Sequence, residues 1–239
     1  MKTLLLKFSG PLQSWGTDSH FETRQTDRYP SKSGVIGMIA ACLGYRRKED
    51  QKIQKLNDLD FGVRIDQNGE SIQDYHTAKK YKNNGLLDRT YVTRRYYLQD
   101  AVFVVAIGHE DKQFVKKIEE GLKNPYFQPF MGRRSLPLPM DFFIRSTDSG
   151  VVESLSQISW QAADWYKKIN SNILTAYVDS NLVSEKTIKM RKDKVQSFSQ
   201  KNRSFGFRGE ARIKIGVQGN KRLENRFLKE HDAFDALGG

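Results

Sequence analysis

The chain has 239 residues, of which 38% are hydrophobic and 28% charged, and its formal net charge is +12 at pH 7. This composition excludes a disordered chain and predicts one large or two modest folded domains with a polyanionic partner. A single cysteine, Cys42, excludes an internal disulfide and a thiolate metal cluster. No run approaches the roughly 20 apolar residues of a membrane span, so we expect a soluble cytoplasmic protein.

The predicted elements alternate as strand, helix, strand, strand, helix, strand over residues 1–145. Residues 3–9 read as a buried strand, and Ser33 is expected to cap a helix that ends before Gly44. A helical segment at 49–59, a strand at 61–66 and a hairpin-type turn at Asn68-Gly69 follow. The apolar run 101–107 indicates a central strand, 111–123 an amphipathic helix, and 142–144 part of a last strand.

This order is that of the ferredoxin-like, RRM-like fold, which belongs to the α+β class. Its helices would cover one face of a four-stranded antiparallel sheet and leave the other face available for a ligand. We therefore expect a ferredoxin-like domain over 1–145 and a small C-terminal β-rich region over 146–239. That region would hold a half-buried strand at 210–217 and a helical tail at 222–237.

Two windows concentrate the basic residues. The first, 74–97, is an insertion between predicted strands, with six basic residues against two acidic ones and half of the tyrosines. The second, 186–214, has ten basic residues against two acidic ones. A merely solvated surface would spread this charge, so we interpret both windows as binding surfaces for a polyanion.

Three loops carry candidate phosphate contacts. Lys32, Ser33 and Gly34 open a predicted helix, whose free N–H groups attract anions, although an ordinary serine cap with a solvated lysine fits equally. In the run Gly132-Arg133-Arg134-Ser135, the glycine would let a ligand backbone come close while the two guanidiniums bind phosphates. The alternative is a surface loop with two solvated arginines. The segment with Arg203, Phe205 and Arg208 interleaves aromatics with arginines, which suits single-stranded RNA, while Phe205 could also belong to the core.

The residue pattern favours a binding function over a catalytic one. Tyr75, His76 and Lys79 could form an acid–base set for metal-independent RNA cleavage, but local hydrogen bonding of His76 explains the same residues. The four histidines show no metal-ligand spacing, and neither a P-loop nor a nucleophile elbow is present. We expect no metal and no cofactor.

Several motifs, in order and spacing, resemble the CasD family, the small RAMP subunits of type I-E CRISPR Cascade complexes. They are GPLQSWG at 10–16, Arg24, YPSKSG at 29–34, AACLG at 40–44, DYHT at 74–77, TRRYYL at 93–98, PFMGRRS at 129–135, and Arg203, Phe205 and Arg208. The resemblance covers residues 1 to about 140 well, is thin from 146 to 195, and resumes after 200.

The resemblance implies a non-catalytic subunit with a thumb hairpin at about 66–100. Such a subunit binds and caps the 5′ handle of mature crRNA and bridges the large CasA-type subunit to the CasC-type backbone. Target DNA would be met only through the complex, and no membrane would be involved. The expected RNA-binding residues are Gln13, Trp15, Arg24, Lys32, Ser33, Gly34, His76, Arg94, Tyr96, Gly132, Arg133, Arg134, Ser135, Arg203, Phe205 and Arg208.

This interpretation makes a spatial prediction, because Trp15, Lys32, Arg133 and Arg203 should then share one groove. Two alternatives stay open. One is a repeat-processing endoribonuclease that uses Tyr75, His76 and Lys79, and the other is a basic module whose charge serves an acidic protein partner.

Overall fold

The structure is a computed structural model that describes residues 1–16, 22–184 and 187–217. The predicted helical tail at 222–237 lies outside the described residues. The strands are β1 (Lys2–Ser9), β2 (Leu12–Gln13), β3 (Thr23–Arg24), β4 (Asp60–Gln67), β5 (Glu70–Tyr81), β6 (Leu87–Gln99), β7 (Val102–His109), β8 (Phe143–Thr147), β9 (Ile173–Asp179), β10 (Ile188–Ser197) and β11 (Ser204–Gly216). The helices are α1 (Lys32–Cys42), α2 (Asp50–Lys55), α3 (Lys112–Lys123), α4 (Val151–Gln157) and α5 (Asp164–Lys167), with 3-10 turns η1 (Leu56–Asp58) and η2 (Ser180–Leu182).

A seven-stranded antiparallel sheet forms the body of the protein, in the order β10-β11-β9-β4-β7-β1-β8. Strand β7 lies inside it, and all its residues from Val102 to Gly108 are buried. Such a position requires apolar side chains on both faces, which explains the continuous hydrophobic run. The prediction of a central strand at 101–107 is confirmed.

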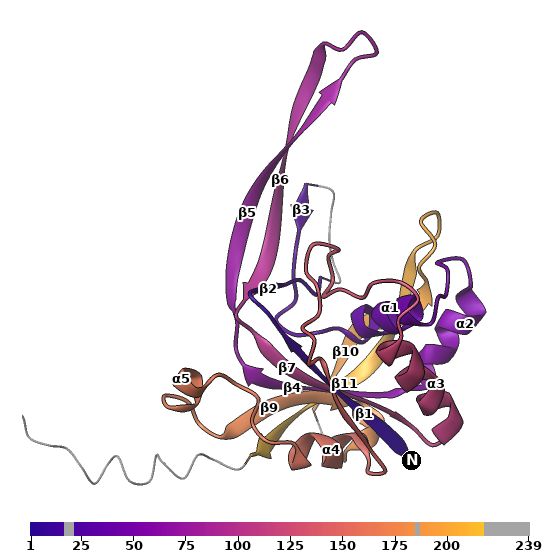
Figure 1. Cartoon of the computed structure of the whole chain (residues 1–239), viewed down its shortest axis with the longest axis vertical. Helices are drawn as coiled ribbons and strands as arrows, with labels where there is room; N and C mark the ends of the chain where they lie inside the picture. The colour runs from indigo at the N-terminus through magenta and orange to yellow at the C-terminus, as the bar shows by residue number, and fades with distance from the viewer. Residues whose placement is uncertain (17–21, 185–186, 218–239) are drawn as a thin grey trace, which may run out of the picture.

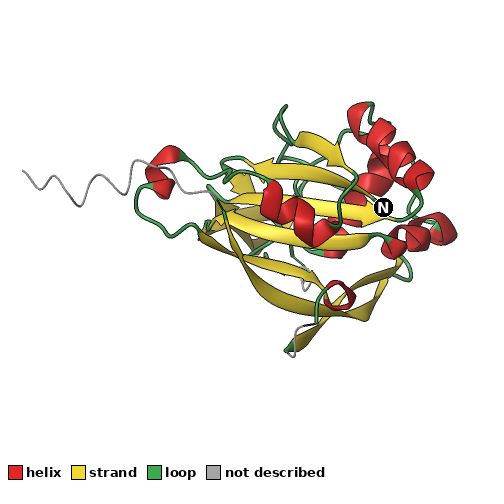
Figure 2. Cartoon of the chain, turned by 90° about the horizontal axis from the view of Figure 1, so that it is seen from below, coloured by secondary structure: helices red, strands yellow, loops and turns green. Residues whose placement is uncertain are grey.

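Helices pack on both faces of this sheet (Figure 2). Leu4 and Leu6 of β1 belong to a core shared with α1, α2 and α3, whereas Leu5 belongs to a second core with α4. Successive strand residues point to opposite faces, so each strand contributes to both cores. The expectation that one face of the sheet stays available is wrong along β1, β4 and β7, because Val151 and Leu155 of α4 cover that face.

The C-terminal strands extend the same sheet. Strand β9 pairs with β4, and β11 pairs with β9 in turn. Along β11, Ala211 and Ile215 are buried, while Arg212 and Lys214 are exposed, as the alternating pattern predicts. The proposed boundary near residue 145 therefore does not coincide with a break in the sheet.

Two local predictions are wrong. The N-cap of α1 is Ser31 rather than Ser33, since the Ser31 side chain accepts a hydrogen bond from the backbone N–H of Gly34. Asn68-Gly69 does not close a hairpin, because β4 pairs with β7 and β9 whereas β5 pairs with β6. At these two residues the chain passes from the large sheet to a smaller one.

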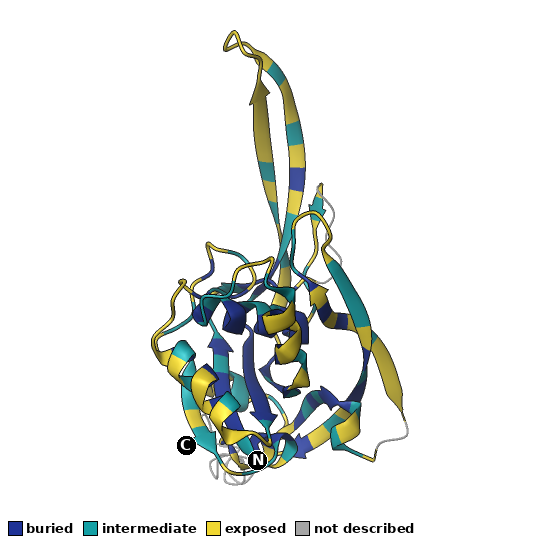
Figure 3. Cartoon of the chain, turned by 90° about the vertical axis from the view of Figure 1, so that its right-hand side faces the viewer, coloured by how far each residue is buried: buried dark blue, intermediate teal, exposed yellow. Residues whose placement is uncertain are grey.

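The smaller sheet carries the most prominent feature, the long hairpin of β5 and β6, which projects from the body (Figure 1). It falls within the interval 66–100 where a hairpin is predicted. Strands β2 and β3 pair with β6 near its base. Most of its outer part is exposed (Figure 3). Because an isolated hairpin gains little from burial, this arm is suited to contacts outside its own chain.

Among the residues that the structure describes, no helix has the length and apolar character needed to cross a bilayer.

Candidate nucleic-acid interface

Arginines gather where the hairpin leaves the body. The short strand β3 runs parallel to β6, with Arg24 beside Arg95 and Thr23 beside Arg94. The side chains of Arg24 and Arg94 are exposed. Because successive side chains of a strand alternate, Arg24 shares a face of this sheet with Arg95, whereas Arg94 lies on the opposite face.

Arg203 lies in the turn between β10 and β11. Partial burial, and then the positive charges of Arg47 and Arg24, lower the pKa of the Arg203 guanidinium. Both charges act on the Arg203 guanidinium, so Arg24 and Arg47 each lie near Arg203. None of the three has a carboxylate partner within the ranges 1–16, 22–184 and 187–217. We call Arg24, Arg47 and Arg203 the arginine cluster.

Arg133 makes several contacts within the protein. Its Nη2 donates to the carbonyl oxygens of Arg24 and Tyr96, both at 3.0 Å, and its guanidinium lies 4.1 Å from the ring centroid of Tyr97. These contacts fix the 131–136 loop to the hairpin base. The Nη1 group of Arg133 has no hydrogen-bond partner among the described residues, so a phosphate contact of Arg133 stays a prediction. Its neighbours Arg134 and Ser135 are exposed.

Gly132 allows this loop to approach the backbone of Ser14. Its φ is +84°, and a Cβ at this position would lie 1.5 Å from the carbonyl oxygen of Ser14. No side chain fits there. The close approach expected of this glycine is real, but the partner is the protein's own backbone.

Gln13 and Trp15 belong to the core. The Gln13 side chain is fully buried, donates to the Ala101 carbonyl at 2.7 Å, and accepts from the Trp15 indole N–H at 3.0 Å. The Trp15 ring is 2% exposed and stacks on Phe8 at 5.1 Å. This ring is therefore unavailable for stacking on a base, and the conspicuous motif at 10–16 shapes the loop from inside.

The N-terminus of α1 is already occupied by an internal anion. The backbone N–H of Lys32 donates to Asp193 at 2.9 Å, and the Lys32 ammonium binds Asp179 at 2.9 Å. Lys32 and Ser33 are buried, and Gly34 packs near Trp15. The expectation that Trp15 and Lys32 share a groove with Arg133 and Arg203 is wrong, since both are inside the protein.

Arg208 is also internal. Its guanidinium binds Asp193 at 2.7 Å, Asp179 at 2.9 Å and Glu210 at 2.7 Å. Burial alone would lower its pKa, but the three carboxylates outweigh burial and raise it. The expectation that Arg208 closes an RNA groove is wrong, because this guanidinium neutralises buried acids.

Phe205 fits both alternatives left open for it. It is half-buried, contacts Phe198 edge-on, and has the Arg203 guanidinium 5.3 Å from its ring centroid. The ring therefore supports Arg203 at the edge of the arginine cluster while it packs on the core.

The hairpin separates the three candidate catalytic side chains. Tyr75 and Lys79 lie on one face of β5, whereas His76 lies between them in the chain and points to the opposite face. His76 Nε2 is 2.6 Å from Asp74 Oδ2, which is the local hydrogen bond considered above. The acid–base set of Tyr75, His76 and Lys79 therefore does not assemble on one face of this hairpin.

Tyr75 and Arg94 are directly paired across the hairpin, and Tyr96 lies on the same face, where its hydroxyl donates to Gln73 at 2.8 Å. The structure thus places Arg203 near Arg24, and Arg94 and Tyr96 on the other face of the small sheet. Arg134 is exposed on the loop that Arg133 and Gly132 hold at the hairpin base. Sequence reasoning missed Arg47, although the basic run at 46–48 between two predicted helices was a visible signal.

Comparison with known proteins identifies the family. Residues 3–209 match the family described as CRISPR-associated protein (Cas_Cas5). The chain belongs to the Cas5 family. A curated relative, the CRISPR system Cascade subunit CasD of Escherichia coli (strain K12), is 34% identical over 155 residues, which are 59% of this chain and 69% of the relative.

Two solved structures are similar to this Cas5 chain. One, titled CRISPR RNA-guided surveillance complex, has a TM-score of 0.74 and 27% identity, and the match covers 95% of this chain and 98% of that one. The other, titled Crystal structure of Cas protein, has a TM-score of 0.64 and 28% identity, with 91% and 98% coverage. The predicted family resemblance is confirmed.

Proposed function

We propose that this Cas5 protein is a non-catalytic subunit of a CRISPR RNA-guided surveillance complex, in which it holds the 5′ handle of the crRNA. The observation that carries the proposal is the arginine cluster at the hairpin base. The positive charges of Arg24 and Arg47 act on Arg203, and a polyanion bound there would offset that repulsion. Arg134 is exposed on the loop that Arg133 attaches to Arg24, and Arg94 is exposed on the other face of the small sheet, so both add positive charge near the hairpin base.

The fold supports the same assignment. Strands β4, β7, β1 and β8 are neighbours in that order, and the helices α1 and α3 fall between β1 and β4 and between β7 and β8 in the chain. We therefore assign residues 1–145 a ferredoxin-like core with β5–β6 as its thumb. The relatives' titles name a Cascade subunit and an RNA-guided complex, which is consistent with this role.

The projecting hairpin is suited to contact a neighbouring subunit. Its exposed tyrosines, Tyr75 and Tyr81, offer aromatic surface beyond the body of the protein. We propose that the hairpin contacts a CasC-type backbone subunit, while the body contacts the large CasA-type subunit. Target DNA would be reached only through the assembled complex.

RNA binding by the double variant Arg24→Gln, Arg203→Gln tests the main proposal. Each lost contact to a single-strand phosphate should reduce the slope of log affinity against log salt by about 0.7, so the two together should reduce it by about 1.4. The Arg24 change leaves its backbone contact to Arg133 in place. The measurement is a salt titration of the full chain with handle-bearing RNA.

The control variant is Lys116→Gln, Arg145→Gln, which removes the same charge from exposed positions on α3 and on the edge strand β8. It should keep the wild-type slope. An equal slope in both variants would remove the arginine cluster from the RNA site. Failure of the wild-type protein to prefer handle RNA over a scrambled RNA would favour the protein-interaction alternative.

The non-catalytic part of the proposal has its own test. Because His76 faces away from Tyr75 and Lys79, we expect no specific cleavage of repeat RNA incubated with the full chain in EDTA. The variant His76→Ala serves as the comparison and should give the same uncut RNA. Specific cutting that disappears in this variant would instead support the endoribonuclease alternative.

A further inference from the structure

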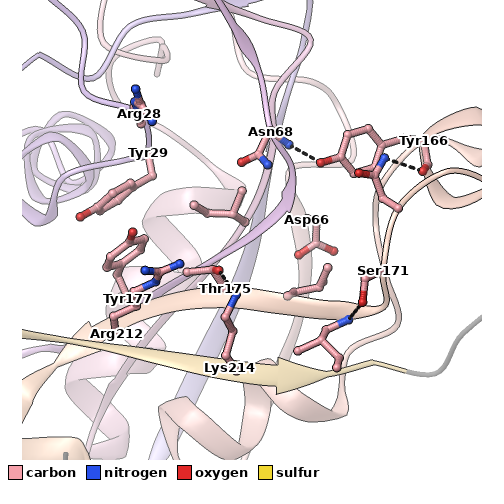
Figure 4. A pocket seen from close by; sticks show the side chains of 14 residues that line it. Arg28, Tyr29, Asp66, Asn68, Tyr166, Ser171, Thr175, Tyr177, Arg212 and Lys214 are labelled. Atoms are coloured by element: carbon pink, nitrogen blue, oxygen red, sulfur yellow. Dashed lines mark hydrogen bonds between the residues drawn. The ribbon is translucent and has the colours of Figure 1, made fainter.

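A second cationic site lies where the end of β4 and Asn68 face strands β9 and β11. It is a pocket of about 340 Å³ whose walls include Arg28, Asn68, Tyr177, Arg212 and Lys214. Figure 4 shows Tyr177, Arg212 and Lys214 on neighbouring strands, with Asn68 and Tyr166 across from Thr175. This volume falls at the lower end of the range for small-ligand sites, about 300–1,000 Å³.

The positive charge of this pocket is not compensated. Arg28, Arg212 and Lys214 form no ion pair with any carboxylate in the part of the chain that the structure describes. The acid in the wall, Asp66, is already neutralised, because its two oxygens accept from Arg64 at 2.7 and 2.8 Å. The pocket therefore presents a net positive charge to whatever enters it.

This arrangement differs from the internal cations nearby. Arg191 and Arg208 are both surrounded by carboxylates, which is how the protein stabilises a charge that it needs only for itself. Arg212 and Lys214 stand on one face of β11, opposite Tyr177 and Thr175 of β9. Arg212 and Lys214 are exposed and side by side, so both can reach one external anion.

The pocket also has a rigid aromatic wall. The rings of Tyr29 and Tyr177 stack at 4.1 Å with planes 7° apart, and the Arg191 guanidinium lies 4.4 Å from the Tyr29 ring centroid. The Tyr29 hydroxyl donates to Glu210 at 2.7 Å, which fixes the stack from its far end. A wall held in this way loses little conformational entropy when a planar group packs against it.

Hydrogen-bonding groups complete the lining. The Tyr166 hydroxyl accepts from the backbone N–H of Asn68 at 3.2 Å, so its own proton remains available for donation. Lys214 reaches Thr175 at 3.0 Å and keeps two further ammonium protons. A ligand with an anionic group, a planar ring and hydroxyl acceptors would find a partner for each.

We propose that this pocket binds one nucleotide unit of single-stranded RNA, with its phosphate at Arg212 and Lys214 and its base against Tyr177. The inference rests on the proposed function and adds a subsite to it. Arg28 lies four residues beyond Arg24 on the same segment, so an RNA held by the arginine cluster is within a short distance of the pocket. An acidic peptide would use the cations but not the stacked aromatic wall.

The test compares the double variant Arg212→Gln, Lys214→Gln with the control Lys116→Gln, Arg145→Gln in the full chain. The probe is handle RNA that carries 4-thiouridine at one position at a time. Wild-type protein and control should crosslink, from one RNA position, to a peptide containing Tyr177. The pocket variant should lose that crosslink and reduce the salt slope by about 0.7–1.4, as expected for one or two phosphate contacts.

The outcomes separate this inference from the proposed function. If wild-type protein binds no handle RNA, both fail. If Arg24→Gln, Arg203→Gln lowers the slope while the pocket variant keeps wild-type slope and crosslinks, the inference is overturned and the proposed function stands. Retained RNA binding with loss of a co-purifying subunit would overturn the inference too, and would place an acidic protein segment in the pocket.

Discussion

Replacing Arg208 with alanine is expected to lower the free energy of unfolding by about 3–5 kcal/mol, the usual cost of removing one partner from a buried ion network. The guanidinium binds Asp179, Asp193 and Glu210, and the first two of these also bind Lys32. Its loss leaves three buried carboxylates short of positive charge. Chemical denaturation with urea, followed by circular dichroism, measures the change.

Arg212→Ala is the matched control, since Arg212 is exposed on the same strand, four residues further on. It should change stability by no more than about 0.5 kcal/mol. An Arg208→Ala protein as stable as this control would contradict the structural role. The fraction of the Arg208→Ala variant that remains folded should keep the wild-type salt slope of RNA binding, because the Arg208 side chain faces carboxylates rather than the surface.

Replacing Gly132 with alanine is expected to displace the 131–136 loop and to weaken RNA binding and stability together. The positive φ alone costs about 1–3 kcal/mol for a residue with a side chain. In addition, the new Cβ would meet the Ser14 carbonyl oxygen at 1.5 Å, and a backbone atom cannot rotate away. Movement of the loop would also break the contacts of Arg133 with Arg24 and Tyr96.

Gly85→Ala separates the two costs. Gly85, at the hairpin tip, has φ +81°, but a Cβ added there would have nothing within 4 Å of it. Both variants bear the conformational cost, and only Gly132→Ala bears the clash. Thermal unfolding and handle-RNA affinity should therefore be affected much more at 132 than at 85. Equal effects at the two positions would show that the contact with Ser14 is unimportant.

Local patterns identified the regular elements well. The apolar run that becomes β7 and the amphipathic period of α3, whose Val115, Ile118 and Leu122 are buried, both record the local packing environment directly. The hairpin was recognisable because its charge and tyrosine content differ from those of a core element. The prediction of a hairpin turn at Asn68-Gly69 was wrong because the chain passes between two sheets there. Which strand pairs with which is not determined by neighbouring residues.

The predicted site residues differ in whether they are exposed or buried, which their sequence pattern did not reveal. Exposed Arg24, Arg134 and Arg203 stay at the surface, whereas Lys32 and Arg208 resemble them in sequence yet are buried. The carboxylate that neutralises Lys32 is 147 residues away in the chain. Neither composition nor spacing reveals such a pairing. A buried basic residue therefore cannot be distinguished from an exposed one by sequence alone.

The family, the central strand, the helices and the basic, tyrosine-rich hairpin are readable from the amino-acid sequence, because each depends on residues close together in the chain or on motifs in order. Which basic residues are available to a ligand follows from the folded chain, because the large sheet brings Asp179 of β9 and Asp193 of β10 to both Lys32 and Arg208. The tertiary structure also showed that α4 covers the second sheet face and that Trp15 is a core residue, since burial depends on the whole packed chain.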